Sequence, residues 1–372
     1  MKKLIAWVLV CLSLPGLLGC TSAEPDPAPE AVPPVTETAA AEVPTEAPTE
    51  APTEALSEEN LYLTVSSVTF SLVGESEDIY LGLASREQVT WESDDPAVVS
   101  VENGILTATG VGTTTIRAVC GDREVSCTAG CLAETLEDLE SLGLDVLTKP
   151  KRQIPEVDMD APCTFYDQSI LIGDSIAFML MQQENKGDYL GDLLFLTRGG
   201  TSVSGLVNYA KNVYFQGHER KIEDAVSASG RQRAYILLGS NDIANDGNRA
   251  MFFDNLDLLL GRMREQSPEL EVVFISNIPK CSANITVRQE LREPYNVLIP
   301  EYNQKLQNYC LENDCLYLDL YRYIEDHCAN MAQEYNIDGY HLNDPGYMTW
   351  MKVMRYFAQY ELDGGVLAPQ AG

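Results

Sequence analysis

Five short apolar runs in the C-terminal part of the chain constrain its fold more than any other feature. They are residues 169–172, 193–196, 234–238, 272–275 and 315–318. None of them alternates between polar and apolar residues, which is typical of parallel strands buried on both faces of a sheet. Stretches with helical spacing, such as 251–264 and 302–312, lie between them. We therefore predict a three-layer α/β/α domain over residues 166–372, built on a five-stranded parallel sheet.

The active site of such a sheet lies at the carboxyl ends of its strands. Gly173-Asp174-Ser175 follows the first strand, where a serine at a strand-to-helix turn can act as a nucleophile or simply belong to a helix cap. Two glycines in residues 198–202 follow the second strand, and glycine lets a backbone N–H approach a substrate oxygen. Gly239-Ser240-Asn241-Asp242 follows the third strand and offers either a side-chain amide donor or an Asx-turn.

A histidine and a carboxylate follow near the C-terminus. In Asp338-Gly339-Tyr340-His341, the histidine can serve as a general base, and the aspartate three residues earlier can orient it. The other two histidines, His218 and His327, are predicted to be structural. Each motif is weak alone, but four of them in this order are improbable by chance. Together they predict a serine nucleophile with a base and oxyanion donors.

These four blocks resemble those of the SGNH, or GDSL-type, serine hydrolase family, over roughly residues 168–360. The resemblance implies a flavodoxin-like sheet and ester hydrolysis through a Ser-acyl intermediate, with no metal or organic cofactor. The residues that it assigns to catalysis are Ser175, Asp338 and His341. The oxyanion donors that it implies are the N–H groups of Ser175 and Gly200 and the side-chain amide of Asn241, with Gly199 or Gly205 as alternatives to Gly200. Asp174 and Asp242 are expected to brace the loops.

The charge of the chain bears on which ester is cleaved. Its 56 acidic and 25 basic residues give a net charge of −31, which disfavours nucleic acid and anionic phospholipid as partners. We therefore favour removal of acetyl or another short acyl group from a glycan. The alternatives are a lysophospholipase or short-chain lipase, an acyltransferase, and a surface adhesin that does not cleave. The apolar residues 178–181 could line a lipid groove, although helical core packing explains them better.

The first twenty residues resemble a bacterial lipoprotein signal. Lys2 and Lys3 precede an apolar run over residues 4–18, which is too short for a stable membrane span. The run ends in Leu17-Leu18-Gly19-Cys20, which resembles the lipobox, whose cysteine is lipidated. An ordinary signal peptide is the alternative. Lipidation of Cys20 would hold the protein on the outer face of the cell membrane, so we expect a bacterial surface protein.

Two further segments lie before the catalytic part. Residues 21–57 consist largely of proline, threonine, glutamate and alanine, which predicts a disordered, extended stalk. Residues 58–131 contain short strand-like runs with turn signals such as Asn103-Gly104, which predict a small β-sandwich. The segments 89–96 and 110–113, together with that turn, resemble the bacterial group 2 Ig-like domain. Residues 132–165 are predicted to be a connector with a short amphipathic helix.

The β domain and the cysteines each allow two interpretations. Such Ig-like domains are spacers or adhesive modules, and the spacer interpretation predicts that deleting residues 21–131 leaves hydrolysis of small esters nearly unchanged. Cys120 and Cys127 flank a tight turn and could face each other across a hairpin, whereas buried free thiols are the alternative for the later cysteines. No cysteine spacing is of the short paired type expected of a zinc site. The oligomeric state is not predicted.

Overall fold

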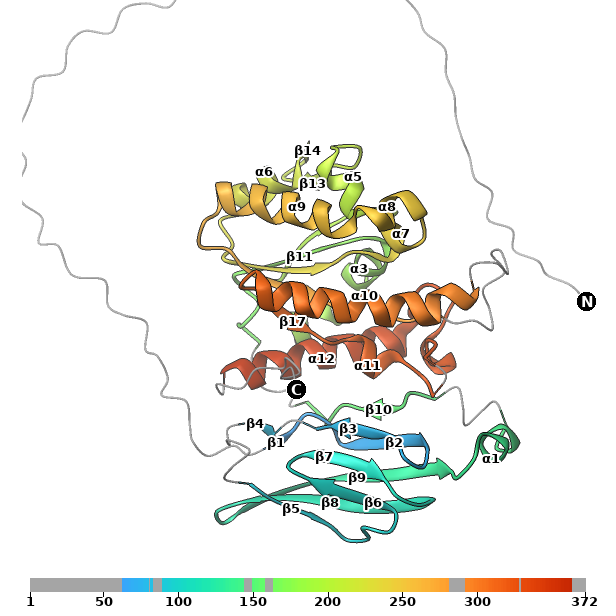
Figure 1. Cartoon of the computed structure of the whole chain (residues 1–372). Helices are drawn as coiled ribbons and strands as arrows, with labels where there is room; N and C mark the ends of the chain where they lie inside the picture. Colours follow the sequence, from blue (N-terminus) through green and yellow to red (C-terminus); the bar gives the residue numbers. More distant parts are fainter. Residues whose placement is uncertain are drawn as a thin grey trace, which may run out of the picture. The chain divides into compact units, whose positions relative to one another are not determined.

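The computed structural model describes residues 62–79, 81–82, 89–143, 149–157, 163–280, 292–327 and 329–362. The predicted signal, the stalk and Cys20 lie outside these residues, as do Cys281 and Cys328. The described residues form a C-terminal α/β domain and a small N-terminal β domain (Figure 1). None of the helices among them is both long and apolar enough to span a membrane.

A five-stranded parallel sheet forms the centre of the C-terminal domain, as the apolar runs predict. Its strand order is β12-β11-β15-β16-β17, and every neighbouring pair is parallel. All five carboxyl ends therefore lie at the same edge of the sheet. The strands are β11 (Ser169–Gly173), β12 (Leu194–Thr197), β15 (Arg233–Leu237), β16 (Glu271–Ile275) and β17 (Leu316–Leu318).

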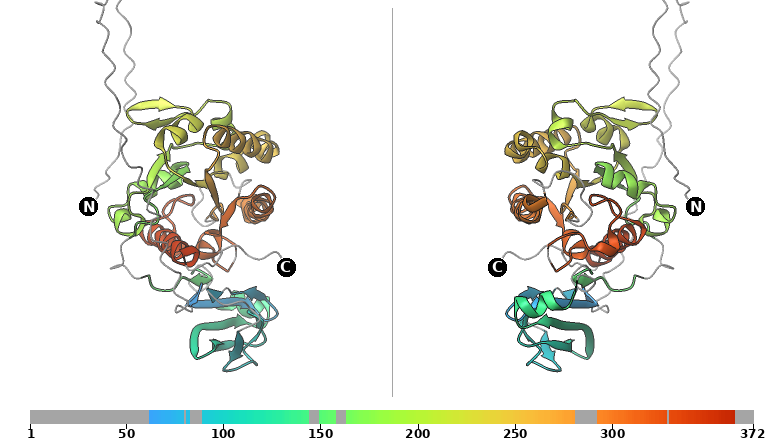
Figure 2. Two further views of the ribbon diagram at one scale, coloured as in Figure 1. Left: turned by 90° about the vertical axis from the view of Figure 1, so that its left-hand side faces the viewer. Right: turned by 90° about the vertical axis from the view of Figure 1, so that its right-hand side faces the viewer.

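Helices cover both faces of this sheet, because successive side chains of a strand point to opposite faces. Ile170 and Ile172 belong to one buried cluster, and Leu171 belongs to the other. Figure 2 shows the helices on both sides of the sheet. The layer against Ile170 contains α5 (Val203–Val207), α6 (Ile222–Ser229), α9 (Phe252–Gln266) and α10 (Arg292–Glu312). The layer against Leu171 contains α3 (Ser175–Met181), α4 (Lys186–Leu190), α11 (Tyr321–Ile324) and α12 (Asp344–Leu362). The predicted three-layer fold is confirmed.

Shorter elements complete the α/β domain. They are the hairpin β13 (Val213–Phe215) and β14 (His218–Arg220), the helices α7 (Ser240–Ile243) and α8 (Asp246–Ala250), and the 3-10 helix η3 (Gln333–Tyr335). Helix α10 begins ten residues before the helix expected at 302–312.

The β domain is a sandwich of two sheets. One sheet has the order β10-β2-β9-β8-β5, in which β10 is Arg152–Gln153, and the other has the order β3-β7-β6, beside a separate pair of β1 and β4. The turn at Asn103-Gly104 joins β6 to β7 as predicted, and both residues have positive φ, 52° and 82°, as a two-residue hairpin turn requires. The strands are β1 (Tyr62–Leu63), β2 (Ser67–Leu72), β3 (Ser76–Asp78), β4 (Leu81–Gly82), β5 (Thr90–Ser93), β6 (Val99–Glu102), β7 (Ile105–Ala108), β8 (Gly112–Cys120) and β9 (Arg123–Ala133).

The cysteines that flank the next turn lie in the paired strands β8 and β9. Cys120 and Cys127 do not face each other, because the register of β8 and β9 pairs Cys120 with Arg123 and Cys127 with Ile116. That expectation was wrong: the hairpin closes directly after Cys120, so Cys127 lies further along the ladder. The six cysteines of the described residues are free thiols. The predicted connector helix is present as α1 (Leu136–Ser141).

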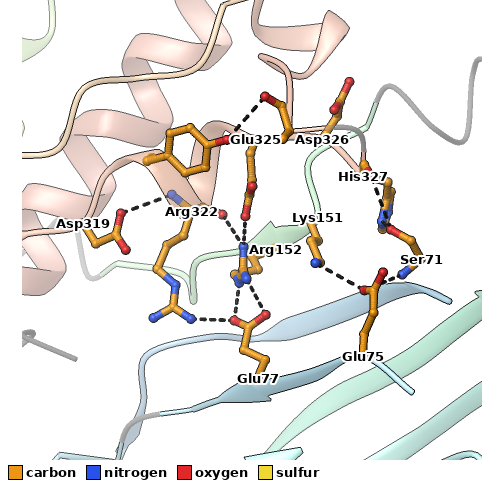
Figure 3. A network of polar contacts seen from close by, with 12 residues as sticks. Ser71, Glu75, Glu77, Lys151, Arg152, Asp319, Arg322, Glu325, Asp326 and His327 are labelled. Carbon is orange, nitrogen blue, oxygen red and sulfur yellow. Dashed lines mark hydrogen bonds and ion pairs between the residues drawn. The ribbon is translucent and has the colours of Figure 1, made fainter. Parts of the chain in front are cut away.

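A buried ion-pair network joins the β domain to the α/β domain (Figure 3). Arg152 lies in β10 (Arg152–Gln153), which pairs with β2, and its guanidinium donates to both carboxylate oxygens of Glu77 and to Glu325. Arg322 of the α/β domain donates to the same Glu77 at 2.6 Å. Although burial alone would raise the pKa of Glu77, the guanidinium groups of Arg152 and Arg322 lower it to about 2. The two domains are therefore held together in part by ion pairs between these particular residues.

The apolar core also continues across this joint. Leu63 and Val65 of the β domain belong to the same buried cluster as Tyr323 and Ile324 of α11. The Tyr323 hydroxyl donates to the carbonyl oxygen of Thr64 at 3.3 Å. Deletion of the β domain would expose part of this shared core. The expectation that deletion of residues 21–131 leaves hydrolysis of small esters nearly unchanged stays a prediction. The likeness of the β domain to bacterial Ig-like domains stays a prediction as well.

Candidate active site

The predicted nucleophile stands at the turn between β11 and α3. Gly173 ends the strand, and a Cβ atom there would lie 2.4 Å from the Cβ of Ala177, so glycine allows α3 to pack this closely. Asp174 caps the helix, because its Oδ1 accepts the N–H of Ile176 at 2.9 Å. Ser175 is the first residue of α3 and is half-buried. Its hydroxyl therefore lies at the carboxyl edge of the sheet.

The structure brings Ser175, His341 and Asp338 together. His341 Nε2 lies 2.9 Å from Ser175 Oγ, and His341 Nδ1 lies 2.7 Å from Asp338 Oδ2. With the proton on Nδ1 donated to the carboxylate, Nε2 is left to accept the serine proton. Ser175 and His341 are 166 positions apart in the chain, so this contact is made by the fold alone.

A tight loop holds the histidine and the aspartate in register. Asp338 Oδ1 accepts the N–H groups of Tyr340 and His341 at 2.9 and 2.8 Å. Burial opposes ionisation of Asp338, but the hydrogen bonds from the His341 ring and from these two N–H groups lower its pKa. Gly339 has a φ of +92°, which favours glycine at this position. The carboxylate is thus ionised and fixed beside the imidazole.

The Asn241 amide is anchored on both sides. Its Nδ2 donates to the carbonyl oxygen of Thr201 at 2.8 Å and to Asp174 Oδ2 at 3.1 Å. These contacts tie the asparagine motif to the serine motif and to the glycine loop. An oxyanion bound by Asn241 would share one N–H of this amide with Asp174 or with the carbonyl oxygen of Thr201.

The geometry of the glycine loop favours Gly200 over Gly205 as a backbone donor. Gly200 has a φ of +66°, and a Cβ atom there would meet nothing within 4 Å. The N–H of Gly205 is donated to Ser202 Oγ at 2.9 Å, as part of the cap of α5. Gly199 is as open as Gly200, so the choice between these two stays a prediction.

The two aspartates beside Ser175 and Asn241 make contacts that brace loops. Asp242 is fully buried and accepts the N–H groups of Val203 and Ser204 at 2.9 and 3.2 Å, and burial raises its pKa to about 6. Asp174 caps α3 and holds Asn241, and burial raises its pKa as well.

The structure adds one residue that the motifs did not identify, Lys280. It follows β16 and is buried, with its Nζ 3.4 Å from Ser240 Oγ and 5.4 Å from the centroid of the Tyr340 ring. The signal available in the sequence was its place five residues after the fourth apolar run, at the carboxyl edge of the sheet.

The other two histidines lie elsewhere. His327 is at the domain joint, where its Nδ1 lies 2.8 Å from Ser71 Oγ and burial lowers its pKa to about 4. His218 is exposed in β14. Among the described residues, no cluster of histidine, cysteine, aspartate or glutamate could hold a metal ion.

Residues 171–348 match the model of the GDSL-like lipase/acylhydrolase family. Similar solved structures cover about half of this chain. A GDSL-like lipase from Bacteroides thetaiotaomicron is 16% identical, with a TM-score of 0.42 over 54% of this chain and 92% of that chain. A member of the lipolytic protein G-D-S-L family from Veillonella parvula is 14% identical, with a TM-score of 0.36 over 50% of this chain and 94% of that chain.

A third structure is the C-terminal catalytic domain of peptidoglycan O-acetyltransferase A from Streptococcus pneumoniae. It is 12% identical, with a TM-score of 0.35 over 50% of this chain and 90% of that chain. No curated protein matches the chain.

Proposed function

We propose that the chain, whose residues 171–348 match the GDSL-like lipase/acylhydrolase family, is a carboxylic ester hydrolase that removes acetyl or another short acyl group from the hydroxyls of a glycan. The single observation that carries the ester chemistry is the chain of contacts from Ser175 Oγ through His341 to Asp338, with distances of 2.9 and 2.7 Å. In this arrangement the histidine can take the proton of the serine hydroxyl, which makes the serine a nucleophile.

In the proposed mechanism, Ser175 Oγ attacks the ester carbonyl while His341 Nε2 takes its proton. Asp338 stabilises the imidazolium that forms. The tetrahedral oxyanion accepts hydrogen bonds from the N–H groups of Ser175 and Gly200 and from the Asn241 amide. His341 then returns the proton to the leaving alcohol, and water hydrolyses the acyl-enzyme with the same base.

Two features support a short acyl group on a neutral substrate. The chain carries a net charge of −31, which disfavours approach to an anionic lipid surface. Of the apolar residues 178–181, Leu180 is fully buried, Met179 and Met181 are half-buried, and Phe178 is exposed. Asn241, which contacts Asp174 beside Ser175, and Lys280, which contacts Ser240, are polar.

We also propose that the protein is held at the bacterial cell surface by a lipid on Cys20. The lipobox-like Leu17-Leu18-Gly19-Cys20 supports this anchor, and the proline-rich segment after it supports a stalk that extends the enzyme toward extracellular polysaccharide. Labelling of the expressed protein with a radioactive fatty acid, compared with a Cys20→Ala variant, tests this location.

The substrate is tested with p-nitrophenyl esters of increasing acyl length, followed by acetate release from acetylated polysaccharides. We expect turnover confined to short chains, and loss of that turnover in Ser175→Ala. A preference for long chains would contradict the short-acyl proposal and favour a lipase or lysophospholipase. Appearance of an acylated sugar when acceptor glycan is added would instead identify an acyltransferase.

A further inference from the structure

The C-terminal end of α10 carries two cysteines that the helix closure brings together. Cys310 lies in the last turn of α10, and Cys315 directly precedes β17. The N–H of Cys315 donates to the carbonyl oxygen of Cys310 at 3.0 Å, and Asp314 between them has a φ of +50°. A left-handed residue followed by an N–H that donates five residues back is the Schellman motif, which ends many helices.

This closure brings the backbones of the two cysteines within the reach of a disulfide. With the carbonyl oxygen of Cys310 and the nitrogen of Cys315 3.0 Å apart, standard bond lengths place the two Cα atoms no more than about 7 Å apart. Any bend along this path shortens the distance further. Cysteines whose Cα atoms are more than about 7 Å apart cannot be bridged without backbone movement, so this pair meets the requirement.

The two side chains also lie against the same part of the core. Cys310 is 1% exposed and belongs to the buried cluster of the α9 and α10 layer, and the half-buried Cys315 packs against that cluster. Arg264 of α9 donates to Cys315 Sγ at 3.6 Å and to the carbonyl oxygen of Asn313 at 2.9 Å. These contacts hold the Cys315 thiol against the end of the helix. Burial and then the neighbouring Cys315 raise the pKa of Cys310, which agrees with two thiols in one apolar place.

We propose that Cys310 and Cys315 are a disulfide site, at which a disulfide compound oxidises the two thiols to a bond that fastens the end of α10 to the start of β17. Cys315, the more accessible thiol, attacks the oxidant as a thiolate and releases its first thiol. The Cys310 thiolate then attacks Cys315 Sγ and releases the second. The two cysteines lose two protons and two electrons, and the oxidant gains them as two thiols.

The place of the pair in the fold predicts a stabilising bond that does not alter the chemistry. Cys315 directly precedes β17, so the pair lies at the amino edge of the parallel sheet. Ser175 and Asn241 follow their strands and lie at the opposite edge. Disulfides persist in oxidising surroundings outside the cell, which is where the proposed lipid anchor would hold the protein. The inference itself does not rest on the proposed function.

The mass of one tryptic peptide tests the bond. Residues 306–322 form a peptide that contains both cysteines, no other cysteine and no internal lysine or arginine. The folded full-length protein is incubated with oxidised glutathione, its remaining thiols are blocked with N-ethylmaleimide in urea, and the chain is digested with trypsin. We expect this peptide to be unblocked and lighter than its dithiol form by two hydrogen atoms. It should take up two blocking groups only after reduction with dithiothreitol.

Two variants and the thermal midpoint complete the test. Cys163→Ser removes a half-buried thiol of the other layer and should leave the bond intact. Cys315→Ser should leave Cys310 as a free thiol that is blocked without reduction. Oxidised wild type should have a thermal midpoint roughly 5 °C above that of the reduced protein, and Cys315→Ser should show no such difference.

The mass of the wild-type peptide decides the matter without any variant. Two blocked thiols before reduction, glutathione attached without closure of the bond, or a bond from this peptide to a cysteine elsewhere in the chain would each overturn the inference. An equal midpoint of oxidised and reduced wild type would overturn the stabilising role of the bond. A wild type that cleaves no ester would overturn the proposed function and leave the disulfide site unaffected.

Discussion

Substitution of Glu77 by glutamine should weaken the joint between the two domains. The carboxylate is 6% exposed and accepts hydrogen bonds from Arg152 and Arg322. Glu77→Gln preserves the size of the side chain but removes its charge. Arg152 would keep its contact with Glu325, but both guanidinium groups would lose the carboxylate of Glu77. Removal of one partner from a buried ion pair is destabilising because the other partner is left uncompensated.

The size of the effect follows from the pKa of Glu77. The two arginines outweigh burial and lower it from 4.5 to about 2, and one pH unit corresponds to about 1.4 kcal/mol, so the charge contributes about 3 kcal/mol of stability. Because the folded-state pKa is the lower one, this stability is fully present above pH 4.5. It is lost progressively as the pH falls from 4.5 toward 2.

Urea denaturation of wild type and Glu77→Gln at pH 7 measures this contribution. We expect the variant to be less stable by about 3 kcal/mol at pH 7, and the difference to narrow below pH 4.5. Asp94→Asn is the matched control: it breaks the exposed pair of Asp94 with Arg117 in the same domain, and should cost at most about 1 kcal/mol. Equal effects of the two variants at pH 7, or a difference that does not depend on pH, would refute the reasoning.

Three further outcomes are expected. Asn241→Ala should lower kcat by roughly 10²–10³-fold and leave KM nearly unchanged, since an oxyanion donor acts in the transition state; steady-state kinetics would contradict this if KM alone rose. Asp338→Ala should reduce kcat less than His341→Ala, because it orients the base without being the base, and the reverse order would count against the assignment. Deletion of residues 21–131 should lower the thermal midpoint, because Tyr323 and Ile324 lose the β-domain side chains that pack against them; an unchanged midpoint would contradict this role of the shared core.

The layers and the motifs of the catalytic domain could be predicted because each is encoded in a short stretch of sequence. Apolar runs such as residues 169–172 identify buried parallel strands, and the carboxyl ends of such strands all lie at one edge of the sheet. Ser175 and Asn241 follow their strands directly, so the fold class alone predicts that they are neighbours. The geometry of His341 with Ser175 then required only that the last motif return to the same edge.

The domain joint and Lys280 could not be predicted in this way. Glu77, Arg152 and Arg322 each look like ordinary surface charges in the sequence, and only the packing of distant segments shows that they are buried together. Lys280 lies in no motif, and its contacts with Ser240 and Tyr340 come from the packing of distant segments. For Cys120 and Cys127, by contrast, the sequence suggested a contact that the structure does not contain. Proximity around a turn does not determine the register of the two strands.

Hydrolysis of p-nitrophenyl acetate by purified wild type, Ser175→Ala and His341→Ala tests the central claim most directly. Circular dichroism and the denaturation midpoint of each variant show that its fold is kept. We predict that the wild type releases p-nitrophenol and that each variant retains no more than roughly 10⁻³ of its kcat. Turnover close to the wild-type rate in either folded variant would contradict the assignment of Ser175 and His341 as nucleophile and base.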